Sequence, residues 1–323
     1  ATIGHSHCLT DDHMVNSDRG WINISEVRVD DKVLSYNNGV NEFVDVEEVF
    51  DFNYSGELIT IGSKKQGSPF RQTVTPNHNL FLKDSGYINV CEAIVTKSAS
   101  DIPLTAMPVD KSIDYPIDDG DIRRIVAICA DGSYCNGSLR FNLVKGRKID
   151  RVNLLFSDSV KGWSKLDNRN AQKTTISKFH EIKVRCEKYF SQNHKSLPKL
   201  FCEQLSVRQM KIVLDELILW DGTSSPKKDE RQWSSGKNGE IDIVSSICNQ
   251  LGYRTSARYK LGDGSCGLVS WSIDRDYQYV SSVEWYNPRL DKWQVSTKKV
   301  KNTSVYCLSN KNNNFWVKEI STG

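Results

Sequence analysis

The sequence contains no uninterrupted run of about 18 apolar residues, the length that a membrane-spanning helix requires, so we expect no membrane segment. It also lacks a basic N-terminal stretch followed by an apolar core, which argues against a secretory signal. Nine cysteines are present, an odd number, and no two of them form a C-x-x-C pair. This pattern disfavours a zinc site or a disulfide framework and is typical of a protein in the reducing cytoplasm.

The remaining composition is typical of a folded protein with more than one domain. The chain has 323 residues, of which 38% are hydrophobic, and it includes eight tryptophans. The net charge of +3 is too small to indicate a nucleic-acid partner by itself. Basic residues cluster at Lys145–Lys148 and at Lys298–Lys301, where they either form solvated faces or contact DNA.

Two apolar runs that end at Asp-Gly, Ile125–Gly132 and Leu214–Gly222, are the most informative feature of the chain. Each predicts a helix that places one carboxylate at its C-terminal tip, with the glycine free to adopt the left-handed cap conformation. If the two helices pack side by side, Asp131 and Asp221 lie together at the mouth of a shared groove. Paired carboxylates of this kind bind divalent metals for phosphodiester cleavage, so the pattern predicts a nuclease.

The sequence around the two runs repeats in the same order. Asp118 and Ser206 are predicted N-caps of the two helices, and the stretch from Ser206 to Gln209 fits a capping box. The segments predicted to follow are a strand, a helix and a strand in the first half, and a strand, a helix and two strands in the second: Ser138–Val144, Ile149–Leu155, Lys173–Val184, then Arg231–Ser234, Ile241–Leu251, Arg254–Lys260 and Leu268–Tyr279. Residues 110–290 therefore indicate an internal αββα-type duplication, the alternative being a coincidental alternation of helices and strands.

Both ends of the chain have β character. Residues 8 to about 105 alternate strand-like segments with turns, as in Lys32–Tyr36 and Glu42–Val46 on either side of Asn37-Asn38-Gly39. Strand-like segments return after Val300. The simplest arrangement is an all-β unit that the C-terminal tail completes and into which the α/β region is inserted.

Several short motifs in these β-rich ends resemble those of inteins. They are Cys8-Leu9-Thr10-Asp11-Asp12-His13-Met14-Val15, continued by Arg19-Gly20-Trp21-Ile22; Asp30-Asp31-Lys32-Val33-Leu34-Ser35; Thr75-Pro76-Asn77-His78; and Val305-Tyr306-Cys307-Leu308 with Asn314-Phe315. The two Asp-Gly helices likewise resemble the paired motifs of LAGLIDADG homing endonucleases. Over nearly the whole chain after residue 7, the sequence resembles an intein, a Hint-fold protein-splicing domain, with an inserted LAGLIDADG homing endonuclease.

The resemblance implies a multidomain fold. An all-β Hint-type splicing domain would comprise residues 8–108 and 296–323, and an α+β LAGLIDADG endonuclease domain with a pseudo-twofold αββα-type repeat would comprise residues 109–295. The halves of the endonuclease would span about residues 116–195 and 206–290, and residues 1–7 would be extein residues or residues added by cloning. The protein would be cytoplasmic, or located wherever its host protein resides.

For splicing, the resemblance assigns catalytic roles to Cys8, Thr75, His78 and Cys307. The Cys8 thiolate would attack the carbonyl of His7 and move the upstream chain onto sulfur as a thioester. Thr75 and His78 would stabilise and protonate that peptide, and Cys307 would take part in acid–base chemistry or in a redox switch.

Three departures from the intein pattern accompany these assignments. Asn313 stands where the family usually has histidine, and Cys307 stands where aspartate is more common. The family also usually ends in an asparagine that cyclises to release the intein, whereas this sequence ends at Gly323. The group for C-terminal cleavage is therefore expected to be absent from the chain as given.

For DNA cleavage, the resemblance implies that Asp131 and Asp221 are catalytic and bind the metal, normally Mg²⁺. Lys195, in Lys195-Ser196-Leu197-Pro198, would polarise the attacking water, the alternative being a solvated loop lysine. The strands that follow each motif would read the major groove of double-stranded DNA. The candidate DNA-binding residues are Arg140, Asn142, Lys145, Arg147, Lys173, Thr175, Ser177, Arg231, Gln232, Ser234, Arg258 and Lys260.

Three functions remain open from the sequence. The first is a monomeric, intein-encoded homing endonuclease joined to a self-splicing domain, with a DNA target site and host exteins as partners. The second is a splicing element whose endonuclease has decayed and only binds DNA, since Val126, Glu216 and Trp220 replace small residues expected between the two helices. The third is an RNA-binding, maturase-like module in residues 110–290, which the splicing motifs disfavour.

Overall fold

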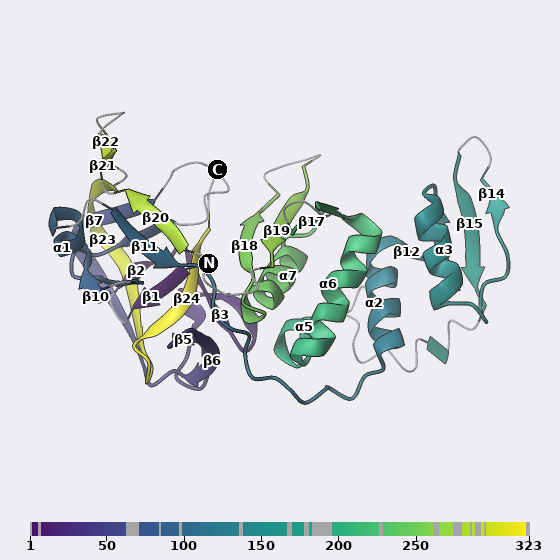
Figure 1. The fold of residues 1–323 in the computed structure, drawn as a ribbon, viewed down its shortest axis with the longest axis horizontal. Coiled ribbons are helices and arrows are strands. Elements are labelled where there is room, and N and C mark those ends of the chain that lie inside the picture. Colours follow the sequence, from purple (N-terminus) through teal and green to yellow (C-terminus); the bar gives the residue numbers. More distant parts are fainter. Residues whose placement is uncertain are drawn as a thin grey trace.

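The computed structural model describes residues 2–5, 8–62, 71–83, 85–96, 99–135, 138–166, 170–177, 181–182, 196–225, 229–260, 265–273, 280–284, 286–287, 292–293 and 295–320. These residues form a β unit and an α/β unit that lie side by side along the long axis of the molecule (Figure 1). The β unit contains the strands from both ends of the chain. No helix in the described ranges combines the length and the apolar character needed to span a bilayer.

The β unit consists mostly of strands, many of them short, whose residues alternate in polarity or are β-branched. Its elements before the α/β unit are β1 (Thr2–His5), β2 (Leu9–Thr10), β3 (His13–Ser17), β4 (Gly20–Asn23), the 3-10 helix η1 (Ile24–Glu26), β5 (Lys32–Asn37), β6 (Val40–Asp45), β7 (Glu48–Gly62), β8 (Arg71–Val74), β9 (Asn79–Leu82), β10 (Gly86–Asn89), the helix α1 (Val90–Thr96) and β11 (Ala99–Pro103). After it they are β20 (Val280–Glu284), β21 (Tyr286–Asn287), β22 (Lys292–Trp293), β23 (Val295–Ser309) and β24 (Asn314–Glu319).

The C-terminal strands pair with strands from the start of the chain. β23 runs antiparallel to β7 and closes a barrel of β2, β23, β7 and β8. β24 lies between β1 and β3 in a six-stranded sheet, and β20 pairs with β11. Leu9, Val74 and Phe315 share one buried core, so side chains from both ends of the chain stabilise the same unit.

The α/β unit contains two halves with the same topology. The first half is α2 (Asp119–Asp131), β12 (Gly132–Cys135), β13 (Ser138–Leu143), α3 (Gly146–Leu155), β14 (Ser164–Lys165) and β15 (Gln172–Ile176). After the short helix α5 (Leu200–Glu203), the second is α6 (Val207–Asp221), β16 (Gly222–Ser225), β17 (Glu230–Ser235), α7 (Asn238–Gln250), β18 (Arg254–Arg258) and β19 (Gly267–Ser272). The sheet orders β12-β13-β15-β14 and β16-β17-β19-β18 are equivalent, which confirms the predicted internal duplication.

The helices α2 and α6 lie against each other at the centre of the α/β unit (Figure 1). Their apolar residues recur at helical spacing, and Ile122, Ile125, Val213 and Leu217 are almost completely buried in one core. The same core includes Phe141 from the first sheet and residues of the second sheet. This packing fixes the relative position of the two halves.

The predicted strand from Lys173 to Val184 is wrong in its second part. β15 ends at Ile176, and Glu181 and Ile182 are helical, with the Ile182 side chain buried in the core. The prediction was wrong because a short run with scattered apolar residues is equally compatible with a buried strand and a buried helix.

Buried polar contacts join the two units. Asn16 of β3 donates a hydrogen bond to the Asn249 side chain of α7 at 2.9 Å, and Asn41 of β6 donates to the Asn249 carbonyl at 2.9 Å. Lys318 of β24 donates to Asp242 Oδ1 of α7 at 2.7 Å. Because buried polar groups need matched partners, these contacts specify one arrangement of the units.

Candidate functional site

The two Asp-Gly helices bring their C-terminal ends together. The Asp118 side chain caps α2 by accepting the Gly120 N–H, and Ser206 and Gln209 form the predicted capping box of α6. At the other ends, Lys148 Nζ lies 2.6 Å from Asp131 Oδ2 and 2.8 Å from Asp221 Oδ1. Since both carboxylates contact the same nitrogen, they lie close to each other.

The glycines after these aspartates do not adopt the left-handed conformation that the sequence suggested. Gly132 has φ −68° and ψ 144°, and Gly222 has φ −106° and ψ 169°, so both are extended. A Cβ added at Gly132 would lie 2.6 Å from the Ile128 carbonyl oxygen, and one at Gly222 would lie 2.6 Å from Ile218 Cα. At both positions the backbone passes from helix to strand so close to the preceding helical turn that only glycine fits.

Lys148, in the first turn of α3, is the residue that the sequence interpretation missed at this site. Only 6% of it is exposed, and its ammonium lies 5.9 Å from the centre of the Trp220 ring. Burial disfavours its charge, but the hydrogen bonds to Asp131 and Asp221 outweigh burial and raise its pKa above the ordinary lysine value. The sequence placed Lys148 in a basic cluster, and nothing in that local pattern distinguished it from Lys145.

The helix interface accommodates the large residues that had argued against close packing. Val126, Glu216 and Trp220 are fully buried. The Glu216 carboxylate accepts hydrogen bonds from Arg151 Nε at 2.8 Å and from Trp220 Nε1 at 2.9 Å, and it lies 3.3 Å from Arg123 Nη1. These partners come from α2, α3 and α6, so the buried charge is compensated within the interface itself.

The predicted DNA-binding residues of the strands mostly lie on the sheet faces turned away from the core. In the first sheet, Leu139, Phe141, Thr174 and Ile176 are buried, and the residues that alternate with them are therefore on the open face. In the second sheet, Trp233, Val269 and Trp271 define the buried face. The candidates on the open faces are Arg140, Asn142, Lys173, Thr175, Gln232, Ser234 and Arg258.

Arg231 does not join this set. It has the same strand parity as the buried Trp233, and its guanidinium forms an ion pair with Asp215 of α6. The prediction that Arg231 lies on the DNA-facing side is therefore corrected, because side chains alternate along a strand and Gln232 takes the open face.

The other candidates lie outside the strands. Lys145 is exposed at the start of α3, and Arg147 donates a hydrogen bond to the Trp220 carbonyl at 3.2 Å. Ser177 follows β15 and donates its hydroxyl to the Ser159 carbonyl at 2.9 Å, while Lys260 follows β18. Lys195 lies outside the described residues.

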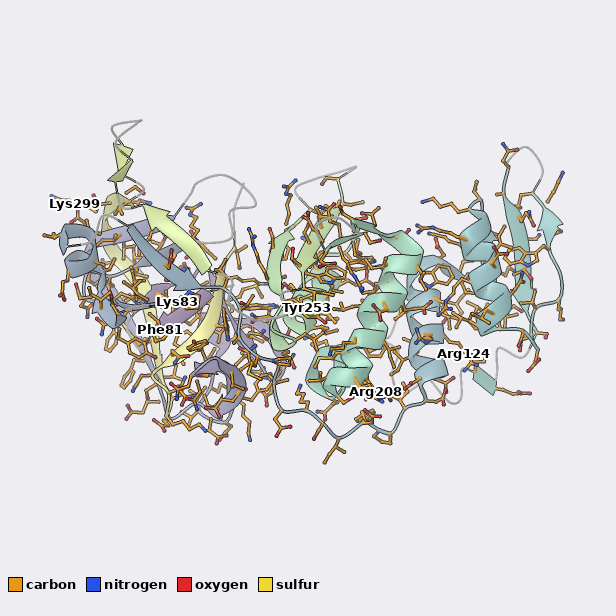
Figure 2. The ribbon with its side chains drawn as sticks, in the orientation of Figure 1. Phe81, Lys83, Arg124, Arg208, Tyr253 and Lys299 are labelled. Carbon is orange, nitrogen blue, oxygen red and sulfur yellow. A yellow bond between two sulfur atoms is a disulfide. The ribbon has the colours of Figure 1, made fainter. Side chains whose placement is uncertain are left out.

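The C-terminal lysine cluster is remote from this site. Figure 2 shows Lys299 at the outer edge of the β unit, at the opposite end of the molecule from Arg124 of α2. Lys298, Lys299 and Lys301 all belong to the exposed part of β23. They are a separate basic surface and do not contribute to the carboxylate pair.

A divalent metal suits the two carboxylates only with additional ligands. Among the described residues, no group of three or more histidine, cysteine, aspartate or glutamate side chains is placed to hold a metal ion. Mg²⁺ is commonly bound by one or two carboxylates together with waters and substrate phosphates. Asp131 and Asp221 fit that donor set, and they do not form a complete cage.

The second predicted centre lies in the β unit. The Thr75 N–H donates to the Cys8 carbonyl at 3.3 Å, and the His78 N–H donates to the Thr75 carbonyl at 3.0 Å. Thr75 and His78 are both buried, and the Thr75 hydroxyl donates to Asn77 Oδ1 at 2.6 Å. The structure therefore brings Cys8, Thr75 and His78 together, although 67 positions of the numbering separate the first two.

Cys8 and Cys307 form a disulfide, with their Cα atoms 4.6 Å apart. The cysteine pattern disfavoured a disulfide framework, and the structure nevertheless contains this one disulfide. The pairing of Leu9 with Tyr306 in β2 and β23 places the two cysteines together although they lie 299 residues apart, and cysteine spacing cannot reveal such a contact. By contrast Cys202 is an inert core thiol, and its burial raises its pKa to about 12.

Comparisons with known proteins give partial likenesses. No protein-family profile matches the chain. A segment of 82 residues, 25% of this chain, is 37% identical to the ATP-dependent Clp protease proteolytic subunit of Chlamydomonas moewusii, and it spans only 8% of that protein.

Three solved structures show partial similarity to about half of the chain. The N-terminal LAGLIDADG domain of DUF199/WhiA has a TM-score of 0.34 and 13% identity, covering 49% of this chain and 77% of that domain. I-DmoI in complex with DNA and Mn has a TM-score of 0.34 and 13% identity, covering 50% of this chain and 93% of I-DmoI. Mesophilic variants of the homing endonuclease I-DmoI have a TM-score of 0.34 and 14% identity, covering 49% of this chain and 91% of theirs.

Proposed function

We propose that the chain is a site-specific endonuclease that makes a double-strand break in DNA. The observation that carries this proposal is the meeting of Asp131 and Asp221, from the ends of two equivalent helices, at one lysine ammonium. Each helix leads directly into a sheet whose open face carries polar and basic side chains. A duplicated site of this kind suits a duplex, which presents two strands related by an approximate twofold axis.

Asp131 and Asp221 would hold the divalent cation, for which we propose Mg²⁺. When bound there, the cation supplies a Lewis acid that activates water and stabilises the leaving oxygen. Lys148 contributes a positive charge within reach of both carboxylates, so it can also contact a phosphate that approaches them. The buried Trp220 ring beneath Lys148 limits water on that side and strengthens the local electrostatics.

The sheets would supply the DNA contacts. We propose that Arg140, Asn142, Gln232 and Arg258 reach base edges in the major groove, since arginine, asparagine and glutamine side chains form bidentate hydrogen bonds with bases. Lys145 and Arg147 lie at the exposed start of α3 and suit phosphate contacts, which position the duplex without reading its sequence.

The test begins with recovery of cleaved sites from a randomised duplex library, because the target sequence is unknown. Asp131→Asn and Asp221→Asn are expected to abolish double-strand cleavage of the recovered site in Mg²⁺ while retaining binding of that DNA in Ca²⁺. Asp150→Asn, an exposed carboxylate on α3, is the matched control and should cleave normally. Undiminished cleavage by either active-site variant contradicts the assignment.

A chain that binds duplex DNA and cleaves no library member supports the alternative of a decayed, DNA-binding endonuclease. Preference for structured RNA over duplex DNA supports the maturase-like alternative instead. Both outcomes refute the double-strand endonuclease. They leave the β unit to be tested independently.

A second activity, autoprocessing at Cys8, is favoured by the contact of Cys8 with Thr75. The disulfide occupies the Cys8 sulfur, so attack on the His7 carbonyl first requires reduction by a thiol. Reduction breaks the S–S bond, leaves two thiols in the protein and oxidises the reductant. The freed thiolate would then form a bond to the His7 carbonyl carbon while the peptide C–N bond breaks. The departing Cys8 nitrogen would take up a proton, for which we propose His78 as the donor, and become the free amine.

Intact-mass measurement tests this activity without DNA. We expect loss of residues 1–7 after incubation with a dithiol and hydroxylamine, and no loss without the dithiol. Cys307→Ala should react without prior reduction, and Cys8→Ala should not react at all. Retention of residues 1–7 by the reduced wild-type chain contradicts autoprocessing.

A further inference from the structure

The ammonium of Lys148 occupies the position between Asp131 and Asp221 where a shared cation would have to bind. Its nitrogen lies 2.6 Å and 2.8 Å from their oxygens. We propose that Lys148 is a built-in counter-ion that keeps divalent cations from the carboxylate pair until a DNA phosphate draws the ammonium away. This inference rests on the proposed metal-dependent nuclease and adds that its metal site is completed only by substrate.

Space and charge both support competition between Lys148 and a metal. A bound Mg²⁺ or Ca²⁺ requires its oxygen ligands at about 2.0 to 2.6 Å, so it cannot share the position of an ammonium that contacts the same oxygens. The ammonium also neutralises one of the two negative charges, and two of its three N–H donors are used by the carboxylates. A cation entering the pair therefore meets a repelling charge and carboxylates that already have partners.

Only the first half of the α/β unit places a lysine at this position, as a comparison of the two halves shows. The helices α3 and α7 are equivalent, and their fourth residues from the N-cap onward are Lys148 and Glu240. The Glu240 carboxylate accepts hydrogen bonds from the Leu197 N–H at 3.0 Å, the Ser235 hydroxyl at 2.6 Å and Lys237 Nζ at 3.1 Å. The second half thus supplies no equivalent ammonium, and Lys148 serves both carboxylates alone among the described residues.

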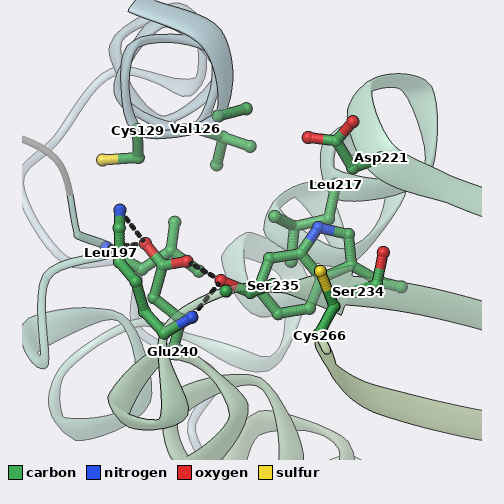
Figure 3. Close-up of a pocket in the computed structure, with 13 residues that line it drawn as sticks. Val126, Cys129, Leu197, Leu217, Asp221, Ser234, Ser235, Glu240 and Cys266 are labelled. Carbon is green, nitrogen blue, oxygen red and sulfur yellow. Dashed lines mark hydrogen bonds and ion pairs between the residues drawn. The ribbon is translucent and has the colours of Figure 1, made fainter. Parts of the chain in front are cut away.

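A cavity adjoins Asp221 on the side of the second half. The cavity, of about 380 Å³, lies between α2, α6, β17 and α7, and its lining includes Asp221, Ser234 and Lys237. Figure 3 shows Asp221 and Glu240 on opposite sides of this cavity. The Lys148 ammonium has a long and flexible stem, so it can move toward a phosphate that approaches the carboxylate pair.

The alternative is that Lys148 is only a structural ion pair. In that case Lys148 stays between the carboxylates when DNA binds, so adding the duplex changes Mn²⁺ affinity by the same factor in the wild type and in Lys148→Met. The change in Mn²⁺ affinity on adding DNA therefore distinguishes the two roles, and an equal change in the wild type and in Lys148→Met overturns the proposal.

The experiment measures Mn²⁺ binding to the full chain by electron paramagnetic resonance of the free ion, first without DNA. Lys148→Met is expected to bind Mn²⁺ at least tenfold more tightly than the wild type. Lys161→Met removes an exposed lysine of the same unit and should match the wild type. Asp221→Asn introduced into the Lys148→Met variant should abolish the gained binding, which assigns it to the carboxylate pair.

The second arm adds the duplex recovered from the library. The duplex should tighten Mn²⁺ binding strongly in the wild type and only slightly in Lys148→Met, because the blocking ammonium is already absent from that variant. If Lys148→Met does not fold, judged by circular dichroism, Lys148→Gln replaces it, because glutamine retains a hydrogen-bond donor and lacks the charge.

If the wild type binds Mn²⁺ through Asp221 and the Lys148 variant binds it equally or more weakly, the role of Lys148 as a blocking counter-ion is refuted. The proposal of a metal-dependent nuclease is not affected by that result. Absence of Mn²⁺ binding in every variant, with and without the duplex, refutes both the blocking role of Lys148 and the metal-dependent nuclease.

Discussion

Replacing Gly222 or Gly132 with alanine is expected to destabilise the α/β unit strongly. A Cβ at Gly222 would lie 2.6 Å from Ile218 Cα and 3.0 Å from the Gln232 carbonyl oxygen, and one at Gly132 would lie 2.6 Å from the Ile128 carbonyl oxygen. These neighbours are backbone atoms, so no side-chain rotation relieves the overlap. The helix end and the strand must separate instead, which also displaces the adjacent aspartate.

We expect each substitution to lower the free energy of unfolding by about 2 to 3 kcal/mol, the upper part of the range of about 1 to 3 kcal/mol typical of atoms forced into closely packed positions. Both glycines have negative φ, so backbone strain adds nothing to this value. Urea unfolding followed by circular dichroism measures the change.

Gly146→Ala and Gly239→Ala are the matched controls, one in each half. A Cβ at either position meets no heavy atom within 4 Å, and both residues belong to helices. Alanine should stabilise these positions by up to about 1 kcal/mol, because it restricts the unfolded chain and favours the helix. If Gly222→Ala and Gly132→Ala are as stable as these controls, the close-approach argument is refuted.

Two further predictions concern buried charges. Glu216→Gln leaves Arg151 and Arg123 without their carboxylate and should lower the free energy of unfolding by about 3 kcal/mol, whereas a change within about 0.5 kcal/mol would show that the buried pairs are dispensable. Burial lowers the pKa of Lys111 from 10.5 to about 8, so the unfolded chain binds more protons between these values and stability rises with pH across that window. Relative to Lys111→Met, the wild type should gain at most about 3 kcal/mol between pH 8 and pH 10.5, and a pH-independent difference contradicts the assignment.

Much of the α/β unit could be predicted because its signals are local. Apolar residues at helical spacing, the caps at Asp118 and Ser206, and the alternation in the strands depend on neighbours a few residues away. The repeated Asp-Gly ending identified the two carboxylates before any geometry was known. The strand predicted from Lys173 to Val184 was wrong after Ile176, because the local pattern there suits both a strand and a helix.

The candidate site itself could be predicted only in part. Asp131 and Asp221 have a position in a repeated pattern, whereas Lys148 is one of several basic residues in its segment. Arg231 was placed on the wrong face because its orientation depends on which residue of β17 enters the core, and Trp233 decides that. The sequence gives the residue types of a strand, whereas the register of the sheet decides which side chains face the core and which face outward.

The sequence by itself determined the elements, their caps, the duplication and the residue types of the two carboxylates, since these follow from short-range periodicity and backbone hydrogen bonding. The tertiary structure alone decided that Lys148 joins Asp131 to Asp221, that Gly132 and Gly222 serve close approach, and that Cys8 bonds to Cys307. The Lys148 contacts and the disulfide join segments up to 299 residues apart, and the glycine contacts depend on the angle at which each strand leaves its helix. The pattern of residue types along the chain encodes neither.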